Sequence, residues 1–171
     1  MMAVKHISMI YARSKTGIIG RRDGSLPVKC RDDMTFFKEK TMGSTLIVGR
    51  KTYEGLPPLS GRSIIVLSKS VTSAPSRACP SLVAIIDNVE DALSKAREIG
   101  RDVYIAGGRE VYETFAGMGV IETVYETIYD DGVEEADGDV KYSYTPLSED
   151  GKGLVVKDTL YLNGCHVNVW R

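Results

Sequence analysis

Residues 26–37 bring two acids, Asp32 and Asp33, close to two aromatic rings and a proline. The Leu-Pro pair that begins this stretch is extended, because the proline ring disfavours helical backbone at the preceding residue. A helix over about 32–42 places Asp33, Phe36 and Phe37 on one face, since positions three and four apart are helix neighbours. A carboxylate beside two rings suits the wall of a binding pocket. In the simpler interpretation, one of the two acids caps the helix and interacts with its dipole.

Three predicted strands end in residues that suit phosphate groups. The strand at 45–48 is followed by Gly49-Arg50-Lys51-Thr52, that at 63–67 by Ser68-Lys69, and that at 102–106 by Gly107-Gly108. In open α/β sheets, ligands bind at the carboxyl ends of strands, where helix N-termini offer amide donors. We therefore expect one extended, phosphate-bearing ligand across these ends. Residues 43–52 are not a P-loop, because a β-branched strand separates their two glycines.

The remaining elements indicate an α/β domain whose sheet is partly parallel. Further strands are predicted at 4–12, 82–86 and 120–129, further helices at 89–99 and 109–116, and a surface loop at 70–80. Asn163-Gly164 between two alternating runs predicts a C-terminal hairpin, 153–162 with 165–170. The glycine-containing segment 13–25 is either a mobile lid or an ordinary surface loop. The acidic segment 130–139 lacks EF-hand spacing, which favours a solvated loop over a calcium site.

Composition limits the function classes. The 171 residues suit one domain, residues 1–171, and a net charge of −1 gives no basic field for nucleic acid. Three cysteines without a CxxC pair and two histidines favour reduced thiols in the cytoplasm over a disulfide framework or a metal site. Cys30 is either a reactive thiol beside the acid or, as the sequence favours, a small buried residue, and His6 and His166 are expected to be structural. No signal peptide or membrane span is apparent.

In this order, the motifs resemble dihydrofolate reductase over essentially the whole chain. The matching segments are Ile19-Gly20 with Leu26-Pro27, Asp33 with Phe36-Phe37-Lys38 and Thr41-Met42-Gly43, residues 48–54, Leu59-Ser60-Gly61-Arg62, residues 64–68, and Ile105-Ala106-Gly107-Gly108 with Val111-Tyr112. The resemblance implies an eight-stranded, mostly parallel sheet with an antiparallel C-terminal hairpin and flanking helices. It also implies NADPH-dependent reduction of 7,8-dihydrofolate to tetrahydrofolate by a cytoplasmic monomer.

The same resemblance implies site residues. Asp33 matches the catalytic acid of the pterin pocket, and Arg62 matches the arginine that binds the glutamate carboxylate of folate. The other substrate-binding positions are Ile10, Ala12, Phe37, Leu56, Leu59 and Thr127. The NADPH-binding positions are Ala12, Ile19, Gly20, Gly49, Arg50, Lys51, Thr52, Leu67, Ser68, Lys69, Ala106, Gly107, Gly108, Arg109, Glu110, Val111 and Tyr112. The cation at Lys69 favours the 2′-phosphate of NADPH, Gly107 and Gly108 match a pair joined by a cis peptide, and no metal is implied.

The chain departs from the family pattern at several positions. Val28 stands where the family usually has tryptophan, and the segment before Leu26 is one residue longer. Ala106 replaces a larger aliphatic residue, and Val140 follows Asp139 where a polar residue is common. Two alternatives remain: a pyrimidine reductase of riboflavin synthesis, and a catalytically silent protein that binds pterin or nucleotide.

Overall fold

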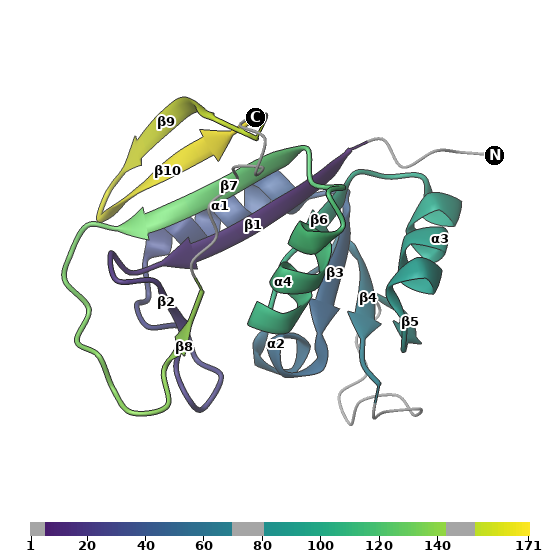
Figure 1. Cartoon of the computed structure of the whole chain (residues 1–171), viewed down its shortest axis with the longest axis horizontal. Coiled ribbons are helices and arrows are strands. Elements are labelled where there is room, and N and C mark those ends of the chain that lie inside the picture. The colour runs from purple at the N-terminus through teal and green to yellow at the C-terminus, as the bar shows by residue number, and fades with distance from the viewer. Residues whose placement is uncertain (1–5, 70–80, 143–152) are drawn as a thin grey trace.

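The protein was analysed as a computed structural model that describes residues 6–69, 81–142 and 153–171. The predicted surface loop at 70–80 and the first residues of the predicted strand at 4–12 lie outside the described residues. Figure 1 shows the arrangement of the elements, with the C-terminal hairpin at one end of the sheet and β5 at the other.

One eight-stranded sheet organises the chain, in the order β5-β4-β3-β6-β1-β7-β10-β9. The pairs from β5 to β7 are parallel, while β10 is antiparallel to both β7 and β9. This is the predicted fold class. The strands are β1 (Ile7–Arg13), β3 (Thr45–Gly49), β4 (Ser63–Leu67), β5 (Leu82–Ile86), β6 (Val103–Ile105), β7 (Thr123–Tyr129), β9 (Val156–Leu162) and β10 (Cys165–Trp170).

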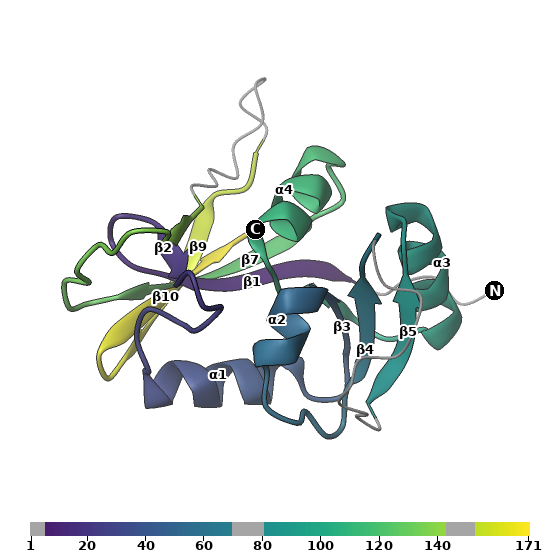
Figure 2. The same ribbon diagram turned by 90° about the horizontal axis from the view of Figure 1, so that it is seen from below.

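Helices cover both faces of this sheet, as Figures 1 and 2 show. They are α1 (Arg31–Thr41), α2 (Arg50–Gly55), α3 (Val89–Ile99) and α4 (Arg109–Gly117). Phe36 and Phe37 of α1 and Tyr53 of α2 pack on one apolar cluster, while Leu93 of α3 and Phe115 of α4 belong to the other. Central strands such as β3 are buried on both faces, which explains their continuous apolar sequence.

The predicted loop at 13–25 is partly regular. It contains β2 (Ile18–Gly20), which pairs antiparallel with β8 (Val140–Lys141). Arg21 donates from Nη1 to Asp139 Oδ2 at 2.7 Å and to the Glu134 carbonyl at 3.0 Å. The sequence predicted a loop here but not this strand, whose partners lie in and just after the acidic 130–139 segment.

The helix ends agree in part with the sequence. Asn88 caps α3 through its side chain, and Gly100 ends that helix in a left-handed conformation, as expected. The acids of α1 are not its caps: the N-cap is Cys30, which makes no side-chain cap bond. Asp32 instead accepts a hydrogen bond from the backbone amide of Asn163, at the tip of the β9–β10 hairpin. Asp32 thus attaches the start of α1 to that hairpin.

Candidate active site

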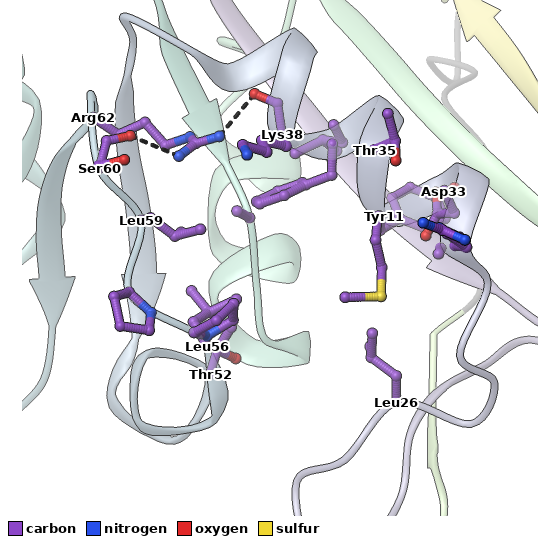
Figure 3. A pocket seen from close by; sticks show the side chains of 18 of the residues that line it. Tyr11, Leu26, Asp33, Thr35, Lys38, Thr52, Leu56, Leu59, Ser60 and Arg62 are labelled. Atoms are coloured by element: carbon purple, nitrogen blue, oxygen red, sulfur yellow. Dashed lines mark hydrogen bonds between the residues drawn. The ribbon is translucent and has the colours of Figure 1, made fainter.

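A cavity of about 550 Å³ lies between α1, α2 and the ends of the central strands (Figure 3). It is lined mainly by apolar side chains, with Asp33 at one end and Arg62 at the other. Seven of the predicted substrate residues line it: Ile10, Ala12, Asp33, Phe37, Leu56, Leu59 and Arg62. The structure therefore brings together residues from three separate parts of the chain: β1, α1 and the connection from α2 to β4.

Asp33 lies in the first turn of α1 and faces β7 of the sheet. The eighth predicted substrate residue, Thr127, donates from Oγ1 to Asp33 Oδ1 at 2.8 Å. Thr127 is held in place because β7 pairs in parallel with β1, with Thr127 opposite Ala12. Burial raises the pKa of the Asp33 carboxyl above its ordinary value, and the bond from Thr127 opposes this only in part. The cavity thus holds a carboxyl group that is protonated more readily than an exposed one.

Arg62 lies in the opposite wall of the cavity and is only 4% exposed, so its charge is held by internal hydrogen bonds. Its Nε donates to Thr41 Oγ1 at 2.9 Å, Nη1 to the Ser60 carbonyl at 2.8 Å, and Nη2 to the Lys38 carbonyl at 2.7 Å. Burial lowers the pKa of the guanidinium, but a group that ionises above pH 12 in water keeps its charge near neutrality. Three of its five N–H donors are used within the described part of the chain, which leaves two for a ligand.

The carboxyl ends of β4, β3 and β6 lie side by side, as the phosphate hypothesis requires. Gly49 is opposite Leu67 of β4, and its amide donates to the Gly107 carbonyl at 2.7 Å. The Gly107–Gly108 peptide is cis, as the resemblance implied. A Cβ at Gly107 would lie 3.3 Å from Thr52 and Tyr112 side-chain atoms, in a backbone with φ of +121°, so only glycine fits without strain.

The predicted cofactor residues fall into three groups. Ala12, Thr52, Ala106 and Tyr112 line the cavity, so the strand ends and the acid share one space. Most of the others lie where these strands end or on the helices that follow: Gly49, Arg50, Lys51, Leu67, Ser68, Lys69, Gly107, Gly108, Arg109, Glu110 and Val111. Ile19 and Gly20 belong to β2 and are not among the lining residues.

Two of the predicted phosphate-binding cations already have partners. Arg50 pairs with Glu54 at 2.9 Å and Arg109 with Glu113 at 2.9 Å, both on exposed helix surfaces. Exposed pairs of this kind exchange partners at little cost. Lys69 follows the end of β4 and is exposed.

Sequence reasoning missed several lining residues: Tyr11, Leu26, Arg31, Met34, Thr35, Lys38, Pro57, Pro58 and Ser60. Met34 and Lys38 are four positions apart on α1, so they share a helix face with one another, next to the face of Asp33 and Phe37. Pro57 and Pro58 had been interpreted only as a turn, and nothing local marks a turn as a cavity wall. Val28 is absent from the lining and packs against Cys30, Tyr129 and Cys165.

Within the described ranges, no group of three or more histidine, cysteine or acidic residues could hold a metal ion. No helix among the described residues is both long and apolar enough to cross a bilayer.

Comparisons with known proteins agree with this geometry. The family model described as dihydrofolate reductase matches residues 6–147. A dihydrofolate reductase of Enterococcus faecium is 32% identical over 91% of this chain and 90% of its own length. A type 1 dihydrofolate reductase of Escherichia coli is 29% identical over 82% of this chain and 83% of its own.

The fold is also that of a solved structure. A dihydrofolate reductase from Enterococcus faecalis, complexed with NADP(H) and RAB-propyl, superposes with a TM-score of 0.77 at 24% identity. The match covers 100% of this chain and 98% of the other. The chain therefore belongs to the dihydrofolate reductase family, whose members are NADPH-dependent oxidoreductases.

Proposed function

We propose that this chain reduces 7,8-dihydrofolate to 5,6,7,8-tetrahydrofolate with NADPH, binding the pterin at Asp33 and the glutamate tail at Arg62. The observation that carries the proposal is the pair of opposite charges at the two ends of one apolar cavity. Dihydrofolate has a matching pattern: a hydrogen-bonding pterin, an apolar benzoyl ring and a carboxylate tail. The tail carboxylate fits the two N–H donors that remain on Arg62.

The strand ends support NADPH as the second ligand. The glycine backbone at 49 and 107–108 brings the N-termini of α2 and α4 close together, and helix N-termini suit the negative charge of a pyrophosphate. The E. faecalis relative is complexed with NADP(H). When bound, NADPH supplies the hydride that reduces C6 of the pterin. The chain itself binds and orients both partners and excludes water from the apolar cavity.

Asp33 anchors the pterin ring in this proposal. Its carboxyl group hydrogen-bonds the pterin N3 and 2-amino group, while Thr127 holds the carboxyl in position. Asp33 is the only acid among the residues that line the cavity in the described chain. The proton for N5 therefore comes from solvent, and Asp33 favours its uptake by keeping negative charge beside the ring.

We also infer that residues 1–171 form one domain that acts as a cytoplasmic monomer. The edge strand β9 supports this, because Lys157 and Asp158 on it are exposed, and charges disfavour edge-to-edge association. Light scattering coupled to size-exclusion chromatography tests the monomer: a dimer mass at micromolar concentration would contradict it.

One assay tests the reaction. Oxidation of NADPH is followed by absorbance with dihydrofolate as acceptor, with and without methotrexate. Dihydrofolate-dependent turnover that methotrexate blocks is the expected result. Tight methotrexate binding without turnover would indicate a silent binder. Turnover only with a phosphorylated ribosylamino pyrimidine would indicate a pyrimidine reductase.

A further inference from the structure

Two free thiols lie in contact beneath the start of α1. Cys30 Sγ donates to Cys165 Sγ at 3.4 Å, and both residues are buried and unoxidised. Cys30 is the residue immediately before α1, while Cys165 is the first residue of β10. The two are 135 positions apart, so a bond between them would connect distant parts of the chain.

The surroundings of the pair are specific to this place. Cys30 Sγ also lies 3.6 Å from the Asn163 carbonyl, while Asp32 accepts from the Asn163 amide at 3.0 Å. The hairpin turn at Asn163-Gly164 is therefore bonded to the start of α1 through both Cys30 and Asp32. Tyr129 of β7 belongs to the same apolar cluster as the two cysteines and lies two residues after Thr127, which hydrogen-bonds Asp33.

We propose that Cys30 and Cys165 are a peroxide-sensitive thiol pair whose disulfide reversibly lowers the activity of the adjacent site. The bond requires the sulfurs to approach by about 1.3 Å, because a disulfide is about 2.05 Å long and they now lie 3.4 Å apart. A movement of this size is available to two side chains, one of which lies outside regular secondary structure.

The two sulfurs have different roles. Cys165 is 1% exposed and Cys30 is 9% exposed, so peroxide reaches Cys30 first. Burial raises the pKa of the Cys165 thiol to about 12, which keeps it protonated. Cys30 sulfur attacks one peroxide oxygen, breaks the O–O bond and becomes a sulfenic acid, while the other oxygen leaves as water.

Cys165 then resolves this intermediate. Its sulfur displaces the sulfenic hydroxyl from Cys30 sulfur, and the hydroxyl leaves as a second water with the Cys165 proton. One peroxide is reduced to two waters and two thiols are oxidised to one disulfide. A dithiol such as dithiothreitol reverses the reaction by thiol–disulfide exchange.

The link to activity rests on the proposed function, because Asp33 lies one helical turn after Cys30. Pulling the start of α1 toward β10 moves the carboxyl relative to Thr127 and to the cavity. Displacements near 1 Å at a reacting centre cost up to about a hundredfold in rate. We expect a roughly tenfold loss of kcat/KM for dihydrofolate in the oxidised form, restored by dithiothreitol.

The test uses the full chain with Cys79→Ser, because the third cysteine lies outside the described residues. The protein is treated with hydrogen peroxide, unreacted thiols are alkylated, and intact mass is measured after unfolding. The expected product has lost two hydrogen atoms, takes up no alkylating agent, and yields a peptide linking residues 30 and 165. Two alkylated thiols, or oxygen addition without the linked peptide, would overturn the proposal.

Two control variants separate the disulfide from other damage. Cys165→Ala and Cys30→Ala each remove one partner, so neither variant can form the disulfide. Neither should therefore show a peroxide-induced loss of kcat/KM that dithiothreitol restores at the slow rate of disulfide reduction. A linked peptide with unchanged activity would overturn the coupling to the site. If the reduced protein does not turn over dihydrofolate, the proposed function fails, while the mass measurement still decides the thiol pair.

Discussion

At the scale of single residues, Asp33 combines its proposed role in pterin binding with a cost in stability. Its pKa is raised by burial, so the folded state binds a proton more tightly than the unfolded chain does. Stability therefore falls as pH rises from the ordinary pKa of about 4 through the raised value. Above that window the buried carboxylate is charged, which lowers the free energy of unfolding. Such a cost is common for groups that bind or react with a ligand.

Asp33→Asn should separate these two effects. We expect turnover with dihydrofolate to fall by about 10²–10⁴, because the anchoring charge is lost. The free energy of unfolding of the variant should increase relative to that of the wild type as pH rises from about 3 to 7. The reason is that only the wild type has a buried carboxyl group that ionises in this range. Urea unfolding at several pH values measures this. Equal activity, or a stability difference that does not change with pH, would contradict the assignment.

The proposed uptake of the N5 proton from solvent also predicts a pH dependence of the reaction. The single-turnover rate of NADPH oxidation should fall at high pH, where the proton for N5 becomes scarce. Stopped-flow measurements across the pH range test this, with deuterated NADPH to confirm that hydride transfer is observed. A rate independent of pH would show that protonation is not linked to this step.

Tyr129 offers a contrast, because its hydroxyl has no hydrogen-bond partner among the described residues although the side chain is 1% exposed. Tyr129→Phe should leave stability unchanged or raise the free energy of unfolding by about 1 kcal/mol, since an unpaired buried hydroxyl is costly. Tyr112→Phe is the matched control: its hydroxyl donates to the Ile10 carbonyl at 2.8 Å, and its loss should cost about 1 kcal/mol. Equal losses of free energy of unfolding in the two variants would contradict this difference between an unpaired and a hydrogen-bonded hydroxyl.

At the scale of elements, the segment before Leu26 is anchored to the acidic 130–139 segment by the Arg21–Asp139 pair. The Asp139 side chain is 3% exposed, and its Oδ2 also accepts from the Ala136 amide at 2.7 Å. Together with the β2–β8 pair, this bond fixes the position of the segment relative to residues 139–141. The acidic stretch that composition suggested to be solvated is therefore in part a structural support.

Asp139→Asn should lower the free energy of unfolding by about 1–3 kcal/mol, because it leaves the Arg21 charge without its buried partner. Trypsin should also cleave faster after Arg21 or Arg22. Lys95→Ala is the control, since its pair with Glu98 is exposed and should contribute less than about 1 kcal/mol. Identical losses in the two variants would show that burial of the Arg21–Asp139 pair adds nothing.

The elements themselves were largely predictable, and the reasons are local. The helix at 89–99 has its own cap and terminal glycine, and the hairpin has its Asn-Gly turn, so neighbouring residues define both. Asp32 could not be assigned this way, because its partner Asn163 is 131 positions away. The β2–β8 pair was missed for the same reason: each strand is short, and its partner lies far along the chain.

At the scale of the whole molecule, the parallel sheet order makes one site from distant segments. Residues near 10, 33, 62 and 107 meet only because β3 lies between β4 and β6, and β1 lies beside β7. The sequence motifs indicated which residues belong to the site. They did not indicate which neighbours complete the wall, because that depends on how α1 and the turn at Pro57-Pro58 pack across the cavity.

The three strand ends make a last prediction about the folded molecule and its cofactor. A ligand that binds only the native state adds RT ln(1 + [L]/Kd), about 2.7 kcal/mol at a hundred times Kd. NADPH should therefore raise Tm, and NADH should raise it less at equal concentration, because only NADPH carries the 2′-phosphate that Lys69 can meet. Lys69→Ala should reduce the NADPH shift and leave the NADH shift unchanged. Lys95→Ala, on an exposed face of α3, should change neither. If Lys69→Ala reduces the Tm shifts of NADPH and NADH equally, this lysine does not select the 2′-phosphate. The end of β4 then contributes to binding only by positioning the neighbouring backbone.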